Sequence, residues 1–193
     1  MDRRVEKTRA SIINAFLSIR EGKALERMTV KEICDKADIN KSTFYTHFRD
    51  IYALSEELET KLAANILKGL GPVDQLFNEP EVFTKRLYHA YLDNSRLTGI
   101  LFSGARSNIL VVRIEESFVA LLEEQYPGLL DLPLVSTLLT LEIYGGYNAF
   151  QKCRRFGEDT VISILSSHSR HMLETLSGEG IDIGSFKKGA SSS

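Results

Sequence analysis

Apolar residues recur along this chain at the spacing of an α-helix, and no segment shows the alternation of a strand pair. The pattern is sharpest near the N-terminus, where Val30, Ile33, Cys34 and Ala37 fall at positions i, i+3, i+4 and i+7. This spacing places the four side chains on one buried stripe of a helix. Because the stripe is narrow and its residues are small, we expect this short helix to pack closely on a neighbour.

Polar residues mark the ends of this helix and of the next. Thr29 followed by Glu32 is the pattern of a capping box, so a helix begins directly after Thr29. A turn follows at Asp38 and Ile39, and Asn40 is placed to cap a second helix from Lys41 to Phe48. Two short helices around a tight turn form a helix-turn-helix, which predicts DNA binding.

The second helix has an apolar side and a polar side. At about 100° per residue, Phe44 and Phe48 share one face and anchor the helix, while hydroxyl residues occupy the opposite face. In a major groove, hydroxyls read base edges and the flanking residues reach phosphates. The expected base-reading residues are Ser42, Thr43 and Thr46; the expected phosphate contacts are Lys41, Tyr45 and His47; and Thr29 and Arg49 complete the DNA-contacting set.

The same periodicity predicts helices through the rest of the chain, and therefore an all-α fold. A first helix over about 4–21 completes a three-helix module, and Asp50 caps a fourth helix over about 51–68. Further helices are expected at about 80–94, 96–102, 107–126, 133–156 and 158–176. We expect a helix-turn-helix DNA-binding domain at 1–50, a larger helical domain at 51–177, and a poorly ordered Gly- and Ser-rich tail at 178–193.

Composition and charge agree with this interpretation. With 193 residues, 43% of them hydrophobic, the chain can form a packed core. It has no stretch near the roughly 20 apolar residues that span a bilayer, and its charged start lacks a signal-peptide core, so we expect a cytoplasmic protein without a membrane partner. Residues 1–50 hold 11 Lys/Arg and 8 Asp/Glu, net +3, and the remainder holds 13 and 18, net −5. The positive charge lies where the motif lies.

The sequence offers no pattern of catalytic or metal-binding residues. Cys34 belongs to the buried stripe, where a small apolar residue is needed. Cys153 lies among basic residues, so we weigh a redox-sensing thiol against an ordinary thiol near a dimer interface, and favour the latter. His168 and His171 alone do not make a metal site, and His47 lacks partners for general-base chemistry. We expect no enzyme activity, no metal and no cofactor.

The N-terminal residues resemble the DNA-binding module of the TetR (tetracycline-repressor, AcrR-like) family of bacterial transcriptional regulators. The resemblance covers about the first 55 residues. It is carried by Thr29-Val30 with Ile33 and Ala37, by Lys41-Ser42-Thr43-Phe44-Tyr45, by His47-Phe48, and by Leu54. This order and spacing is far more specific than a generic helix-turn-helix pattern.

Three positions depart from the pattern usual in the family. Asp38 and Ser42 each stand where Gly is common, and Asp38 occupies a turn position that can require positive φ. Ile51 stands where the family commonly has Lys, which removes an expected phosphate contact. Arg49 is the candidate to replace that contact.

The resemblance implies a homodimer that forms through its last two long helices and binds a near-palindromic operator in double-stranded DNA. Members of the family often enclose an effector pocket in the C-terminal domain, so the resemblance implies a dimerisation and effector-binding domain at 51–177. We therefore expect a transcriptional repressor that a small-molecule effector releases from its operator. The alternatives are a DNA-binding dimer controlled by a partner protein and, less favoured, a helical enzyme on the same scaffold.

Two features of the C-terminal half point to special packing. Gly145 and Gly146 are paired inside a predicted helix, where each glycine costs roughly 1 kcal/mol relative to Ala. In order of preference, the pair allows close approach of a partner helix at a dimer interface, forms a helix kink, or makes room for an effector.

Aromatic residues with one cationic anchor form a candidate pocket wall, although ordinary core packing explains most of them equally well. They are Tyr88, Tyr91, Phe102, Arg106, Phe118, Tyr144, Tyr147 and Phe150.

Overall fold

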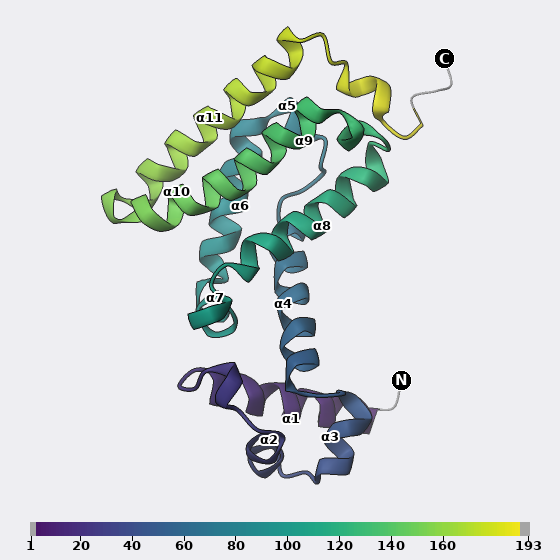
Figure 1. The fold of residues 1–193 in the computed structure, drawn as a ribbon, viewed down its shortest axis with the longest axis vertical. Helices are drawn as coiled ribbons and strands as arrows, with labels where there is room; N and C mark the ends of the chain where they lie inside the picture. The colour runs from purple at the N-terminus through teal and green to yellow at the C-terminus, as the bar shows by residue number, and fades with distance from the viewer. Residues whose placement is uncertain (1–2, 190–193) are drawn as a thin grey trace. The chain divides into compact units, whose positions relative to one another are not determined.

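The computed structural model describes residues 3–189, and within them the fold is entirely helical (Figure 1). The predicted all-α class is confirmed, since no strand occurs between residues 3 and 189. None of the helices in this part of the chain combines the length and the apolar character needed to cross a membrane.

The chain divides into two compact units. The first comprises Met1–Leu62 and Ser95–Leu110, and the second comprises Ala63–Asn94 and Val111–Ser193. The boundary therefore falls within the long helix α4 (Ile51–Lys68), and a second segment of the first unit begins with α7 (Ser95–Leu101). The sequence predicted a boundary at residue 50. The first unit includes the start of α4 and a later segment, because α7 packs on α1 and Arg106 of the later segment pairs with Glu59 of α4.

The first unit is built around a three-helix module. Its elements are α1 (Arg3–Arg20), the 3₁₀ turn η1 (Leu25–Arg27), α2 (Val30–Ala37), α3 (Lys41–His47), the first part of α4 (Ile51–Lys68), α7 (Ser95–Leu101), the 3₁₀ turn η2 (Gly104–Arg106) and the first residues of α8 (Ile109–Gln125). Helix α1 packs on α2 and α7, and α2 packs on α3. The core is formed by fully buried side chains such as Phe16, Leu25, Ile33, Phe44 and Leu54.

The second unit is a bundle in which α11 packs along α6. Its elements are the second part of α4, α5 (Gln75–Asn78), α6 (Pro80–Asp93), most of α8, η3 (Leu129–Asp131), α9 (Pro133–Thr140), η4 (Leu141–Gly145), α10 (Gly146–Cys153), η5 (Arg154–Phe156), α11 (Glu158–Gly178) and η6 (Ile183–Phe186). A core cluster joins α6, α10 and α11 through Tyr88, Phe150, Val161 and Ile162.

The segment predicted as one helix over 133–156 contains a change of helical type. Between α9 and α10, residues Leu141–Gly145 form a π-helical turn, with the wider i→i+5 hydrogen bonding of that structure. The chain remains helical through this turn, and 3₁₀ residues end the segment at Phe156. Hydrophobic spacing alone gave the length of the segment but not this insertion.

The part of the predicted tail that the structure describes contains local structure. Beyond α11, η6 is followed by Lys187, whose ammonium pairs with Asp74 before α5. The Lys188 N–H donates to the Gln125 carbonyl at 2.8 Å. Residues 190–193 of the tail lie outside the described residues.

Candidate functional site

Local hydrogen bonds fix both ends of α2 as the sequence predicts. The Thr29 hydroxyl accepts from the Glu32 N–H, and the Glu32 carboxylate accepts from the Thr29 N–H at 2.9 Å, so both halves of the capping box are present. At the other end, Asp38 has φ 54° and is the one non-glycine residue with positive φ in residues 3–189. This left-handed conformation lets the next N–H, that of Ile39, donate to the Cys34 carbonyl and close the helix.

Helix α3 begins at the predicted cap and presents the predicted polar face. The Asn40 Oδ1 atom accepts from the Thr43 N–H at 2.8 Å. Phe44 and Phe48 are buried beneath the helix, and Phe48 is its C-terminal cap residue rather than its last helical residue. Because the aromatic side is buried, the opposite side faces solvent.

The hydroxyls on this face donate to nearby acceptors of the same helix. Ser42 Oγ and Thr43 Oγ1 donate to Asn40 Oδ1 at 2.7 and 2.8 Å, and Thr46 Oγ1 donates to the Thr43 carbonyl at 2.7 Å. A hydroxyl has one proton and two acceptor lone pairs. With the proton already donated, each of these side chains presents an acceptor to an incoming partner.

The predicted phosphate-contacting residues also lie at the surface, but they differ in exposure and in their hydrogen bonds within the protein. Lys41 and Tyr45 are exposed and His47 is half-buried. Arg49 is exposed and donates to Asp50 Oδ2 at 3.1 Å. The Thr29 hydroxyl and N–H both donate to Glu32, so a phosphate at Thr29 would compete with the capping box.

The unusual residue at the start of α4 has a packing role. Ile51 is buried, and the helix is capped by Asp50, whose Oδ1 accepts from the Ala53 N–H at 2.7 Å. This bond and the pairing with Arg49 lower the pKa of Asp50. A lysine at position 51 would therefore replace a core contact at this end of α4.

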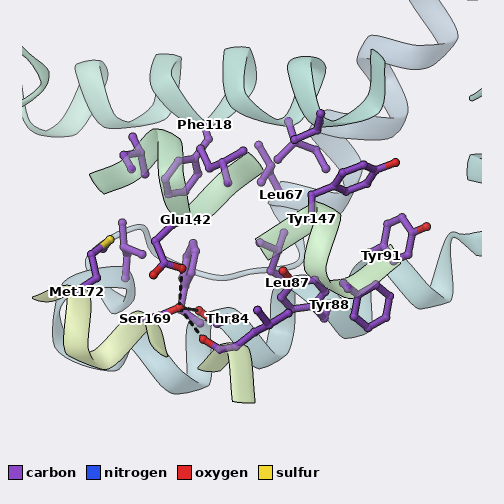
Figure 2. A pocket seen from close by; sticks show the side chains of 18 of the residues that line it. Leu67, Thr84, Leu87, Tyr88, Tyr91, Phe118, Glu142, Tyr147, Ser169 and Met172 are labelled. Carbon is purple, nitrogen blue, oxygen red and sulfur yellow. Dashed lines mark hydrogen bonds between the residues drawn. The ribbon is translucent and has the colours of Figure 1, made fainter. Parts of the chain in front are cut away.

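The second unit encloses an apolar pocket between its helices (Figure 2). Its volume is about 90 Å³. The walls come from α4, α5, α6, α8, α9, η4, α10 and α11, and most of the lining is aliphatic or aromatic. The lining residues are Leu67, Leu76, Phe83, Thr84, Leu87, Tyr88, Tyr91, Val111, Ile114, Phe118, Leu139, Glu142, Ile143, Tyr147, Phe150, Gln151, Leu165, Ser169 and Met172.

One part of the pocket wall is polar. Figure 2 shows Glu142, Ser169 and Thr84 together, with Tyr91 and Tyr147 on another side of the pocket. Thr84 Oγ1 donates to Ser169 Oγ at 2.9 Å, and Ser169 Oγ lies 3.2 Å from Glu142 Oε2. Burial raises the pKa of the Glu142 carboxyl against the opposing influence of His168 and of the hydrogen bond from Ser169.

Five of the eight residues predicted for a ligand site line this pocket. They are Tyr88, Tyr91, Phe118, Tyr147 and Phe150. Burial is the main cause that raises the pKa of both Tyr88 and Tyr147, so these phenols stay neutral.

The other three predicted residues make different contacts. Phe102 and Arg106 belong to the first unit, where Arg106 forms two hydrogen bonds with the buried carboxylate of Glu59, at 2.7 and 2.6 Å. Tyr144 donates from its hydroxyl to Glu115 Oε2 at 2.6 Å and does not line the pocket. Arg106 is therefore not the cationic anchor that the sequence predicted, because it pairs with Glu59 in the first unit. The charged residue that lines the pocket is the acidic Glu142.

The sequence analysis missed Glu142 as a pocket residue. A signal was present, because this glutamate is the one charged residue in the apolar run from Pro133 to Tyr144. Burying an isolated charge costs free energy, so a charged residue in an apolar run is a candidate for a functional role.

The remaining candidate groups have ordinary surroundings. Cys34 is buried in the first-unit core as predicted, and burial raises its pKa. Cys153 is partly buried against the Tyr88 cluster. His171 Nδ1 lies 2.8 Å from the Ser167 carbonyl oxygen. Within residues 3–189, no three His, Cys, Asp or Glu side chains are grouped so as to hold a metal ion.

Comparison with known proteins identifies the N-terminal module. Residues 12–58 match the family described as bacterial regulatory proteins, tetR family. No curated protein matches the sequence. Among solved structures, the crystal structure of the TetR family repressor AlkX from Dietzia sp. strain DQ12-45-1b, implicated in biodegradation of n-alkanes, is similar at 15% identity and a TM-score of 0.40, over 92% of this chain and 98% of that one.

Proposed function

We propose, from the premise that this chain belongs through its N-terminal domain to the tetR family of bacterial regulatory proteins, that it is a cytoplasmic, homodimeric repressor released from its operator by a small effector. A role in transcriptional regulation through the helix-turn-helix follows from the family. The operator, the dimer and the effector are the parts that we propose.

The observation that carries the proposal is the exposed polar face of α3. Buried Phe44 and Phe48 hold the helix on its module, and the hydroxyls of Ser42, Thr43 and Thr46 project on the other side. In the major groove these groups would approach base edges. Since their protons are donated locally, we expect them to accept from the exocyclic amino groups of adenine or cytosine.

Phosphate contacts supply the sequence-independent part of the affinity. We assign them to Lys41, Tyr45 and His47 around α3, with Arg49 beside Asp50. Arg49 would have to exchange its bond to Asp50 for a phosphate, so its contribution is smaller than that of Lys41. Because Ile51 is buried, this assignment needs no contact from that position.

We propose that the dimer forms through the helical segment η4–α10–η5 and through α11. Large apolar side chains are exposed there, namely Leu141, Phe156 and Ile164. A symmetric pairing would bury them and would present two α3 helices to half-sites roughly 34–36 Å apart.

The effector would occupy the pocket of the second unit. A ligand that binds better to one arrangement of the dimer than to the other shifts the population between them, and operator affinity changes by that difference. The pocket contains both apolar surface and a few polar groups, as ligand sites do.

The test is selection of bound fragments from genomic DNA, followed by affinity measurements on the selected site at several salt concentrations. We expect a near-palindromic site whose binding weakens steeply with salt. Lys41→Ala should weaken binding and lower the magnitude of the salt slope by about 1, as loss of one phosphate contact requires. Lys68→Ala, a matched exposed lysine on α4, should change neither quantity.

Tyr45→Phe separates a phosphate contact from a structural role of the ring. It keeps the aromatic packing against Phe44, whose ring centroid lies 5.6 Å away, and removes only the hydroxyl. Loss of affinity without loss of stability supports the contact. Absence of any preferred DNA site, or unchanged affinity in both Lys41→Ala and Tyr45→Phe, would overturn the proposal.

A further inference from the structure

The pocket of the second unit restricts what it can hold. Its volume of about 90 Å³ is small beside the 300–1,000 Å³ typical of sites for drug-sized ligands. Its walls are mostly aliphatic and aromatic side chains. A ligand that fits without movement of the walls must therefore be compact and largely apolar.

Glu142 is the single charged residue among those that line the pocket. Its side chain is only 18% exposed. A carboxylate in such surroundings loses hydration, and that loss is costly unless hydrogen bonds or an opposite charge replace it. An apolar residue here would avoid the cost altogether.

The protein does not fully replace the lost hydration. Glu142 Oε1 is buried and accepts no hydrogen bond from residues 3–189. Glu142 Oε2 faces Ser169 Oγ at 3.2 Å, but the Leu165 carbonyl oxygen lies 3.2 Å from the same hydroxyl. Since a serine hydroxyl has one proton, the carboxylate shares even this donor.

His168 is a weak counter-charge for this carboxylate. Its Nε2 atom lies 3.4 Å from Glu142 Oε1, and its side chain is 70% exposed. Ion pairs with one partner in solvent contribute little, and this one exists only when the imidazole is protonated. Glu142 thus keeps capacity for a further cationic partner.

Glu142 lies in the π turn η4. It lines the cavity together with its neighbour Ile143. π turns often occur at functional sites. A π turn that carries an incompletely paired carboxylate indicates a ligand-binding site.

We infer that the pocket binds a compact organic cation, an apolar body carrying a protonated amine, with the nitrogen paired to Glu142 and the body against the aromatic walls. This inference rests on the proposed effector role of the pocket. Tyr88, Phe118 and Phe150 supply aromatic wall surface for the apolar body. Anions are disfavoured, because no Lys, Arg or His is among the lining residues.

The test uses three probes that share one ring and differ in charge: benzylamine, benzyl alcohol and benzoate. Their affinities for the full chain are measured by calorimetry, with ligand-observed NMR for weak binding. We expect benzylamine to bind at least about tenfold more tightly than benzyl alcohol, and benzoate not to bind. In Glu142→Gln the preference for the amine over the alcohol should fall below about threefold.

Glu115→Gln is the matched control. It removes a carboxylate of the same unit that accepts from Tyr144 and does not line the pocket, so the amine preference should persist. Circular dichroism of both variants checks that each is folded. A preference that survives Glu142→Gln, a tighter-bound alcohol, or absence of binding by all three probes at about 10 mM would overturn the inference.

Measurements on the selected operator separate this inference from the proposed function. Benzylamine should weaken operator binding of the wild type and not of Glu142→Gln. If the operator is bound but the charge preference is absent, only the ligand class is wrong. If the charge preference is present but no DNA site is selected, the proposed repressor function is wrong and the cation site stands.

Discussion

The hydroxyl oxygen of Tyr88 lies so close to Gly146 that a Cβ atom at position 146 would stand 2.7 Å from it. Tyr88 is held there by burial and by the ring of Phe150, whose centroid is 4.8 Å away. Gly145, by contrast, has open space where its Cβ would be. The glycine pair therefore has one member that tertiary packing requires, and its close partner is a side chain of α6.

Gly146→Ala should destabilise the protein by about 1–3 kcal/mol, because the phenol must shift in a packed core. Gly145→Ala should stabilise it by about 0.5–1 kcal/mol through helix propensity. Urea unfolding followed by circular dichroism measures both. Tyr88→Phe in the Gly146→Ala background removes the clashing oxygen and should recover stability. Equal effects of the two alanine substitutions would contradict this account.

Arg106→Ala should destabilise the first unit by about 3–5 kcal/mol, the usual effect of removing one partner of a buried ion pair. Glu59 is fully buried, and its other hydrogen bond comes from Ser55 at 2.7 Å, so the carboxylate would lose the counter-charge that is bonded to it. Arg96→Ala is the control, since Arg96 pairs with Glu21 at the surface, where about 0–1 kcal/mol is expected. Similar losses of unfolding free energy in the two variants would show that the Arg106–Glu59 pair contributes no more than a surface pair.

Glu142→Gln should change how stability depends on pH. The native pKa of Glu142 lies above its ordinary value of 4.5, so the folded chain keeps this proton to higher pH than the unfolded chain does. The free energy of unfolding therefore falls as pH rises from 4.5 through the native pKa. The variant should lack this decline. Parallel pH profiles of wild type and variant would refute the burial argument.

Asn40→Asp should separate helix capping from DNA binding. Aspartate keeps the side-chain oxygen that accepts from the Thr43 N–H, so stability should change by less than about 0.5 kcal/mol. The added negative charge beside the phosphates should weaken operator binding, most strongly at low salt. Asn40→Ala should instead lower stability by about 1 kcal/mol. Normal operator affinity in Asn40→Asp would place Asn40 away from the DNA.

Asp38→Gly should stabilise the module by about 0.5–1 kcal/mol, because glycine adopts φ 54° without the steric penalty of a side chain. Asp38→Ala should have the opposite sign, since alanine keeps the penalty and loses the polar side chain that tolerates this conformation. Thermal unfolding of the two variants distinguishes them. A destabilised Asp38→Gly would show that the carboxylate itself supports the turn.

The sequence by itself determined the helical class, the capping box at Thr29 and the cap at Asn40. These features depend on contacts between residues at most four apart, so their chemistry can be inferred from spacing. The polar face of α3 follows from the same periodicity once Phe44 is assigned to the core.

Only the tertiary structure decided which aromatic residues share a pocket and which charge lies among them. The lining comes from helices that are far apart in sequence, and Arg106 pairs with a glutamate 47 positions away. The need for glycine at position 146 likewise depends on Tyr88, which belongs to another helix. Hydrophobic periodicity gives the buried side of each helix but not its partner, because many pairings bury the same apolar area and packing of the whole unit selects among them.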